Sequence, residues 1–203
     1  MAEKKMRMKG SERRAFIIEQ AKKVFARSSY ADASTGELAR ASEVTEPMLY
    51  KHFGSKKALF LAVIQTASAA FFCRFRKRVQ QRAEHDLLEA LSSILLDYRA
   101  AALSDPDDVF VRLHSSVETS DPDIQTLVRS QMQDVYQAIF ELLKRAQEQG
   151  VLPASLDLNA ATWGYLSFFF AIEYRAKLGI FASFNEETIR EVNRLWLQGL
   201  RQG

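Results

Sequence analysis

The chain contains little cysteine, proline or glycine. Its 203 residues include one cysteine (Cys73), four prolines and eight glycines. A single cysteine excludes a disulfide within the chain, and no group of Cys and His has the spacing of a zinc site. Few glycines and prolines, together with 47% hydrophobic residues, argue against disorder and against a strand-rich fold. The composition therefore predicts a helical protein with short connections and with no metal or other cofactor.

Long hydrophobic runs and catalytic motifs are also missing. The most apolar stretch, 163–172, is much shorter than the roughly 20 residues that cross a bilayer. The basic N-terminus lacks the apolar segment of a signal peptide. No phosphate-binding glycine loop, nucleophile elbow or metal motif is present. We therefore predict a cytoplasmic protein that has no membrane partner and is not an enzyme.

Charge is distributed unevenly. Residues 1–60 carry 13 Lys and Arg against 7 Asp and Glu, net +6, whereas residues 61–203 are net −3. A basic N-terminal segment suits a polyanionic partner, although a solvated tail has the same composition. We expect residues 1–10 to form a basic arm.

Apolar periodicity and capping residues predict three short helices after this arm. Residues 13–27 form the first, and Lys22 is expected to lie off its apolar stripe. Ser34 begins the second as its N-cap. Thr45 begins the third, with Pro47 in its first turn. The short connection between the second and third helices is typical of a helix-turn-helix.

The rest of the chain continues as helices. The periodicity predicts one long helix from about 55 to 84 and further helices at 87–98, 109–117, 124–150, 157–178 and 185–200. The expected fold is all-α with about nine helices. Residues 11–55 form a helix-turn-helix domain and residues 56–203 a larger helical domain.

The third helix is the candidate recognition helix, because such a helix presents its N-terminal residues to the major groove. We predict DNA contacts from residues at or near the helix starts: Ser34, Thr35, Thr45, Glu46, Pro47, Met48, Tyr50, Lys51, His52 and Lys56. Lys56 and Lys57 open the long helix, where a cation opposes the helix dipole. A phosphate bound at this helix start would attract both lysines.

Several short motifs follow one another between Arg13 and Ile64. They are Ala21-x-x-x-Phe25, Tyr30, Leu38-Ala39, Val44-Thr45, Leu49-Tyr50-Lys51-His52-Phe53 and Ser55-Lys56-Lys57-Ala58-Leu59. In this combination the segment resembles the DNA-binding domain of the TetR family of bacterial regulators. The sequence departs from that family at Ser29, Gly36 and Glu43. Glycine is usual at the first and third of these positions, and a long polar side chain is common at the second.

The resemblance implies roles for the candidate residues. Contacts to the DNA backbone would come from Thr35, Thr45, Tyr50, His52 and Lys56. Glu46, Pro47, Met48 and Lys51 would face the groove edges. Glu46 could accept a hydrogen bond from a cytosine amino group, or could act by rejecting wrong sequences.

The resemblance also implies that the later helices bind an effector and form a homodimer. We predict a dimer interface from apolar residues of the last two helices: Trp163, Leu166, Phe170, Ile189, Val192 and Trp196. Burial within one subunit is the alternative. Candidate effector contacts are Phe71, Phe75, Tyr98, Phe110, His114, Tyr136, Phe140 and Phe168, although aromatics at helical spacing are more often plain core.

Together these features predict a ligand-responsive transcriptional regulator. It would be a homodimeric repressor released from a palindromic, inverted-repeat operator in double-stranded DNA by a small apolar or aromatic effector. The alternative is a helical protein-interaction module with weak or vestigial DNA binding, which the departures at Gly36 and Glu43 leave open.

Overall fold

A computed structural model describes residues 9–118, 120–178 and 185–202. The described residues contain nine helices and no strand. The helices are α1 (Gly10–Arg27), α2 (Thr35–Ala41), α3 (Glu46–Phe53), α4 (Lys56–Ala83), α5 (Leu87–Ser104), α6 (Pro106–Val117), α7 (Pro122–Glu148), α8 (Leu158–Leu178) and α9 (Glu186–Gln202). The predicted all-α fold is confirmed. Most of the predicted basic arm lies outside the described residues.

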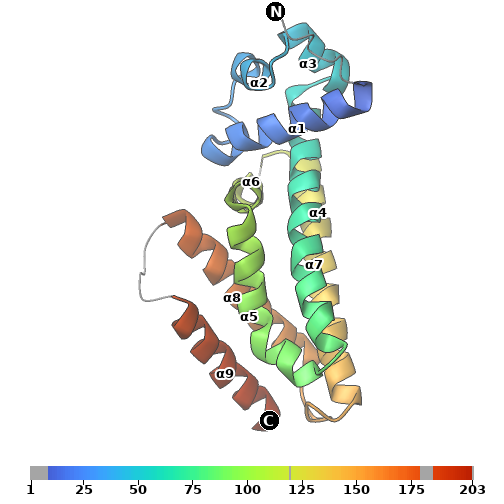
Figure 1. Cartoon of the computed structure of the whole chain (residues 1–203), viewed down its shortest axis with the longest axis vertical. Coiled ribbons are helices and arrows are strands. Elements are labelled where there is room, and N and C mark those ends of the chain that lie inside the picture. The colour runs from blue at the N-terminus through green and yellow to red at the C-terminus, as the bar shows by residue number, and fades with distance from the viewer. Residues whose placement is uncertain (1–8, 119, 179–184, 203) are drawn as a thin grey trace, which may run out of the picture.

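The helices form a small N-terminal unit on top of a larger bundle (Figure 1). Helix α1 crosses the first part of α4, and α2 and α3 lie beyond it. Helix α4 continues into the bundle, where it packs beside α5, α6 and α7. Helices α8 and α9 lie on the bundle's other side and pack against α7 and α5 respectively. One continuous helix, α4, therefore connects the two parts.

Two hydrophobic cores follow this division. The first contains buried residues of α1 to α3 together with Leu59, Phe60 and Val63 from the first half of α4. It also includes Val111 of α6 and Ile124 of α7. The second core lies among α4 to α9. The first half of α4 thus shares a core with the helix-turn-helix, and the domain division after residue 55 stays a prediction.

Helix starts are fixed by the side chains that the sequence indicates. The Glu37 N–H donates to Ser34 Oγ at 3.1 Å, and the Met48 N–H donates to Thr45 Oγ1 at 3.4 Å. Asp121 caps α7 in the same way. These bonds satisfy backbone donors that have no partner within the helix.

The turn between α2 and α3 is tight. Glu43 has a φ of 51°, which is the left-handed region. This geometry costs a residue with a side chain about 1–2 kcal/mol relative to its ordinary conformations. The turn therefore keeps the shape of a glycine-containing turn although glutamate occupies it.

Helix α4 is the one helix in the described residues that is long and apolar enough to cross a membrane by length and composition. Its apolar residues Leu59, Phe60, Val63, Ile64 and Phe71 are each 0% exposed because other helices cover them. This burial is the pattern of the central helix of a helical domain.

Candidate nucleic-acid interface and effector pocket

Helix α3 exposes the side predicted to face DNA. Thr45, Glu46, Pro47 and Lys51 are exposed. Met48 and Tyr50 are 44% and 43% exposed. On the opposite side, Leu49 and Phe53 are buried in the first core. Because α3 is anchored by these two residues, its outer side is free to enter a groove.

The other predicted DNA contacts surround α3. Ser34 is exposed, whereas Thr35, His52 and Lys56 are half-buried. Lys56 Nζ lies 4.7 Å from the centre of the Tyr30 ring and donates to Ala31 O at 3.4 Å. Partial burial lowers the pKa of Lys56, and the charge of Asp32 opposes this effect. Tyr30 thus holds the Lys56 ammonium near the surface that carries α3.

Lys57 does not share this environment. Its Nζ lies 2.6 Å from Asp123 Oδ2 and 3.3 Å from Asp121 Oδ2, at the start of α7. Hydrogen bonds to Asp123 and Asp121 raise the pKa of Lys57. In the fold two carboxylates are the partners of Lys57, and its attraction to a phosphate stays a prediction.

Glu46 also has a partner within the chain. The Thr35 hydroxyl donates to Glu46 Oε2 at 2.8 Å and so joins the first residues of α2 and α3. Two residues predicted to contact DNA therefore contact each other.

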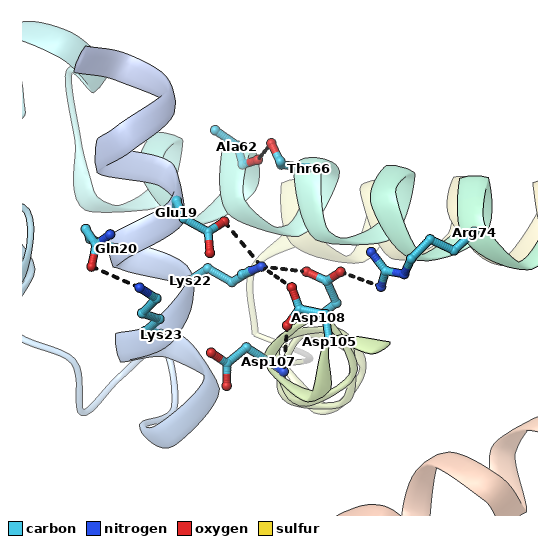
Figure 2. Close-up of polar contacts among 10 residues, drawn as sticks. All are labelled: Glu19, Gln20, Lys22, Lys23, Ala62, Thr66, Arg74, Asp105, Asp107 and Asp108. Atoms are coloured by element: carbon cyan, nitrogen blue, oxygen red, sulfur yellow. Dashed lines mark hydrogen bonds and ion pairs between the residues drawn. The ribbon is translucent and has the colours of Figure 1, made fainter. Parts of the chain in front are cut away.

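A buried ion-pair network joins the N-terminal unit to the bundle (Figure 2). Lys22 of α1 is 6% exposed, so the expectation that it lies off the apolar stripe is wrong. Its Nζ lies 2.6 Å from Asp105, 3.1 Å from Asp108 and 3.3 Å from Glu19. Asp108, at the start of α6, also accepts from Arg74 of α4 at 2.7 Å. Three helices meet at these charges.

The charges of this network stabilise one another. Burial by itself lowers the pKa of Lys22, but the hydrogen bonds and charges of Asp105 and Asp108 raise it well above its ordinary value. Burial by itself raises the pKa of Asp105, and its hydrogen bond to Lys22 and the lysine charge bring it below its ordinary value. Lys22 and Asp105 are therefore both ionised near neutral pH.

A further contact ties α6 to the N-terminal unit. The His114 ring donates from Nδ1 to the Phe25 carbonyl of α1 at 2.8 Å. Helix α6 thus contacts α1 through His114 near its end as well as through the aspartates at its start. Any displacement of α6 along its axis has to break or move these bonds.

A pocket lies among α4, α6, α7 and α8. Its volume is about 190 Å³. Its apolar lining is Phe72, Leu113, Val128, Met132 and Phe170, and its polar lining is Arg112, Ser115, Ser116, Gln131, Glu173 and Tyr174. The combination of an apolar wall and a few polar groups is typical of a small-molecule site.

Arg112 and Glu173 form a buried pair at the pocket wall. Arg112 Nη1 lies 2.6 Å from Glu173 Oε1, and the two side chains are 11% and 5% exposed. The Tyr98 hydroxyl donates to the same carboxylate oxygen at 2.5 Å. Burial raises the pKa of Tyr98, and the charge of Glu173 adds to this, so the hydroxyl keeps its proton. The Arg112 guanidinium also lies over the rings of Phe71 and Phe72.

The eight predicted effector contacts are not gathered in this pocket. Phe71, Phe75 and Tyr98 are buried in the second core, whereas Phe110 packs on the first. The Tyr136 hydroxyl donates to Asn159 on an exposed side of the bundle, and the Phe140 ring lies beside Tyr136. Phe168 packs on Trp196, and His114 contacts α1 as described. As effector contacts these positions stay predictions.

The predicted dimer residues divide into two groups. Leu166 and Ile189 are buried within the chain, at 2% and 1% exposure, and Val192 and Trp196 are partly covered by the second core. Trp196 packs so closely on α8 that a Cβ at Gly164 would lie 2.2 Å from its ring. Trp163 and Phe170, in contrast, are 54% and 37% exposed. These two residues remain available for a partner subunit.

Sequence reasoning missed the ionic residues that organise the larger domain. Lys22 is expected off the apolar stripe and Asp108 and Arg112 are not singled out in the sequence, because their partners are far away along the chain. No local signal identifies such pairs. Among the described residues, no group of three or more His, Cys, Asp or Glu side chains could hold a metal ion.

Comparisons with known proteins agree with this architecture. Residues 17–63 match the family described as "Bacterial regulatory proteins, tetR family". A 59-residue segment is 41% identical to the HTH-type transcriptional activator FasR of Mycolicibacterium smegmatis, and it spans 29% of this chain and 27% of that relative.

Solved structures match nearly the whole chain. A TetR-family regulator from Cytophaga hutchinsonii has a TM-score of 0.77 at 18% identity, with 96% of this chain and 98% of that chain covered. The regulator FadR from Bacillus subtilis, in complex with stearoyl-CoA, has a TM-score of 0.70 at 15% identity, with 93% and 98% covered. At these identities the structures show the fold. Together, the comparisons show a helix-turn-helix segment similar to that of the TetR family within a chain that has the fold of solved TetR-family regulators.

Proposed function

We propose that the protein is a homodimeric, ligand-responsive repressor that leaves an inverted-repeat operator when a small apolar or aromatic effector binds. The observation that carries the proposal is the position of α6. Arg112, Leu113 and Ser115 of this helix line the pocket, and Asp108 and His114 contact α1 or its lysine. A ligand that prefers a displaced α6 therefore shifts α1 as well, and by linkage weakens DNA binding.

The volume of the pocket limits the size of the effector. At about 190 Å³ it lies below the roughly 300–1,000 Å³ of most ligand sites. A small aromatic or branched apolar molecule suits this volume, whereas a long acyl-CoA such as the stearoyl-CoA in the Bacillus subtilis structure requires a wider opening. The Arg112–Glu173 pair supplies polar groups for one end of the effector.

The first test is a selection of bound duplexes from a random pool of double-stranded DNA. An enriched inverted repeat, bound as a dimer with a steep dependence on salt, supports the proposal. Transcription measured from this site in the presence and absence of the protein then distinguishes repression from activation, since the relative FasR is named an activator. Weak binding without an enriched sequence would favour the protein-interaction module.

Lys56→Ala is expected to weaken binding to all duplexes to a similar degree. Lys56 is held near α3 by Tyr30, and a lysine that contacts a phosphate contributes affinity but no sequence information. The logarithmic dependence of affinity on salt should become shallower by about one unit. Binding titrations at several salt concentrations measure this slope. Lys57→Ala is the matched control, because Asp121 and Asp123 already occupy that lysine, and an equal change in slope for both variants would contradict the assignment.

Met132→Trp is expected to prevent effector-induced release while DNA binding persists. The indole would fill part of the pocket without touching α1 to α3. The measurement is release of the selected duplex during titration with a panel of small apolar and aromatic compounds. Gln133→Trp, an exposed neighbour on the same helix, is the control. Normal release from the Met132→Trp variant would mean that the effector binds elsewhere.

A further inference from the structure

One acidic side chain stands among the residues predicted to face DNA. Glu46 is exposed at the first position of α3, the helix whose last turn carries Lys51 and His52. The bond from the Thr35 hydroxyl to Glu46 Oε2, 2.8 Å long, holds the carboxylate against α2. The negative charge therefore has a defined position on the DNA-facing side.

Gly36 creates the space for this carboxylate. A Cβ at position 36 would lie 3.3 Å from Glu46 Oε1, a distance tighter than nine in ten real Cβ contacts. Any side chain at position 36 would therefore require the Glu46 carboxylate to move by a few tenths of an ångström. The absence of a side chain at Gly36 in α2 and the position of the Glu46 carboxylate in α3 are therefore structurally linked.

The bond between Thr35 and Glu46 changes which DNA groups can lie favourably against the start of α3. The Thr35 proton is directed to Glu46 and is not directed to a phosphate. A carboxylate only accepts hydrogen bonds, so it repels phosphates and the acceptor groups of guanine and thymine. It binds favourably only where a cytosine or adenine amino group lies opposite.

We propose that Glu46, positioned by Thr35 and accommodated by Gly36, determines DNA specificity by penalising non-matching DNA more than the matching site. The inference rests on the proposed operator binding and deepens it. In this proposal the Glu46 carboxylate discriminates by repelling DNA. The repulsion lowers the affinity for most sequences and so raises the ratio of specific to nonspecific binding.

The test uses Glu46→Gln in the full-length protein. Glutamine keeps an acceptor for Thr35, removes the charge and replaces one acceptor oxygen by an amide donor. Affinities are measured for the selected duplex and for a scrambled duplex of equal length at several salt concentrations. We expect the affinity of the variant for the scrambled duplex to rise about tenfold, with a smaller change for the selected duplex. The salt dependence on the scrambled duplex should steepen by about one unit.

Two further variants complete the design. Glu37→Gln removes an equal charge from α2, next to Gly36, and is expected to leave the ratio of the two affinities unchanged. Gly36→Ala keeps the charge of Glu46 and shifts its carboxylate only by a few tenths of an ångström, so it is expected to change the ratio less than Glu46→Gln does. The proposal is overturned if Glu46→Gln leaves the ratio unchanged, if only the selected duplex loses affinity, or if Glu37→Gln has the same effect. A wild-type protein that enriches no duplex would overturn the proposed function as well.

Discussion

Replacing Lys22 by methionine is expected to lower the free energy of unfolding by about 3–5 kcal/mol, the usual effect of removing one partner of a buried ion pair. The substitution leaves Asp108, which is 1% exposed, with Arg74 as its remaining ion-pair partner, and among the described residues it leaves Asp105 with no cation in contact. The buried Asp108 carboxylate then keeps only part of the positive charge that offsets its desolvation, and the half-buried Asp105 loses the lysine in contact with it. Chemical or thermal unfolding measures the loss.

The pH dependence gives a second readout of the same variant. The pKa of Asp105 is lowered in the folded chain, so its contribution is present above its unfolded pKa of about 3.9 and is lost as pH falls through the folded value. The pKa of Lys22 is raised, so its contribution is present below its unfolded pKa of about 10.4 and is lost as pH rises through the folded value. The stability advantage of the wild type over Lys22→Met should therefore be largest between these limits.

Lys23→Met is the matched control. Lys23 is the next residue of α1, and its ammonium contacts only Gln20, at 3.3 Å, among the interactions that the structure defines for it. A change of about 0.5 kcal/mol or less is expected for such a surface substitution. Similar losses for Lys22→Met and Lys23→Met would show that the network does not stabilise the junction.

Arg112→Met is expected to cost a similar amount, about 3–5 kcal/mol. Glu173 is 4% exposed. Without Arg112, the Tyr98 hydroxyl is the remaining partner that the described residues provide for its carboxylate. The cation above the rings of Phe71 and Phe72 is lost as well. Unfolding by denaturant, with an unchanged dependence on denaturant concentration, measures this loss as a change in stability alone.

The double variant Arg112→Met with Glu173→Gln separates a buried charge from a general packing defect. Glutamine still accepts from Tyr98 but carries no charge, so most of the lost stability should return. Arg76→Met, on the exposed side of α4, controls for loss of an arginine. A double variant as unstable as Arg112→Met would attribute the loss to packing and not to the unpaired carboxylate.

The sequence by itself determined the helical fold and the identity of the N-terminal unit. Helix starts follow from local chemistry, since Ser34, Thr45 and Asp121 bond to backbone groups only two or three residues away. The apolar positions of α3, Leu49 and Phe53, are likewise set by helical spacing within one helix. Such short-range effects can be read from the order of residues alone.

Only the tertiary structure decided which polar residues are buried and what they bind. Lys22 meets Asp105 from 83 residues away, and Tyr98 meets Glu173 from 75 residues away. Lys57 looks like a phosphate-binding residue in the sequence and becomes an ion-pair partner of α7. Gly36 looks like a loss of DNA contact and becomes the space for Glu46. These outcomes depend on distances between helices, which no local pattern encodes, because the energy of a charge is set by the groups that packing places around it.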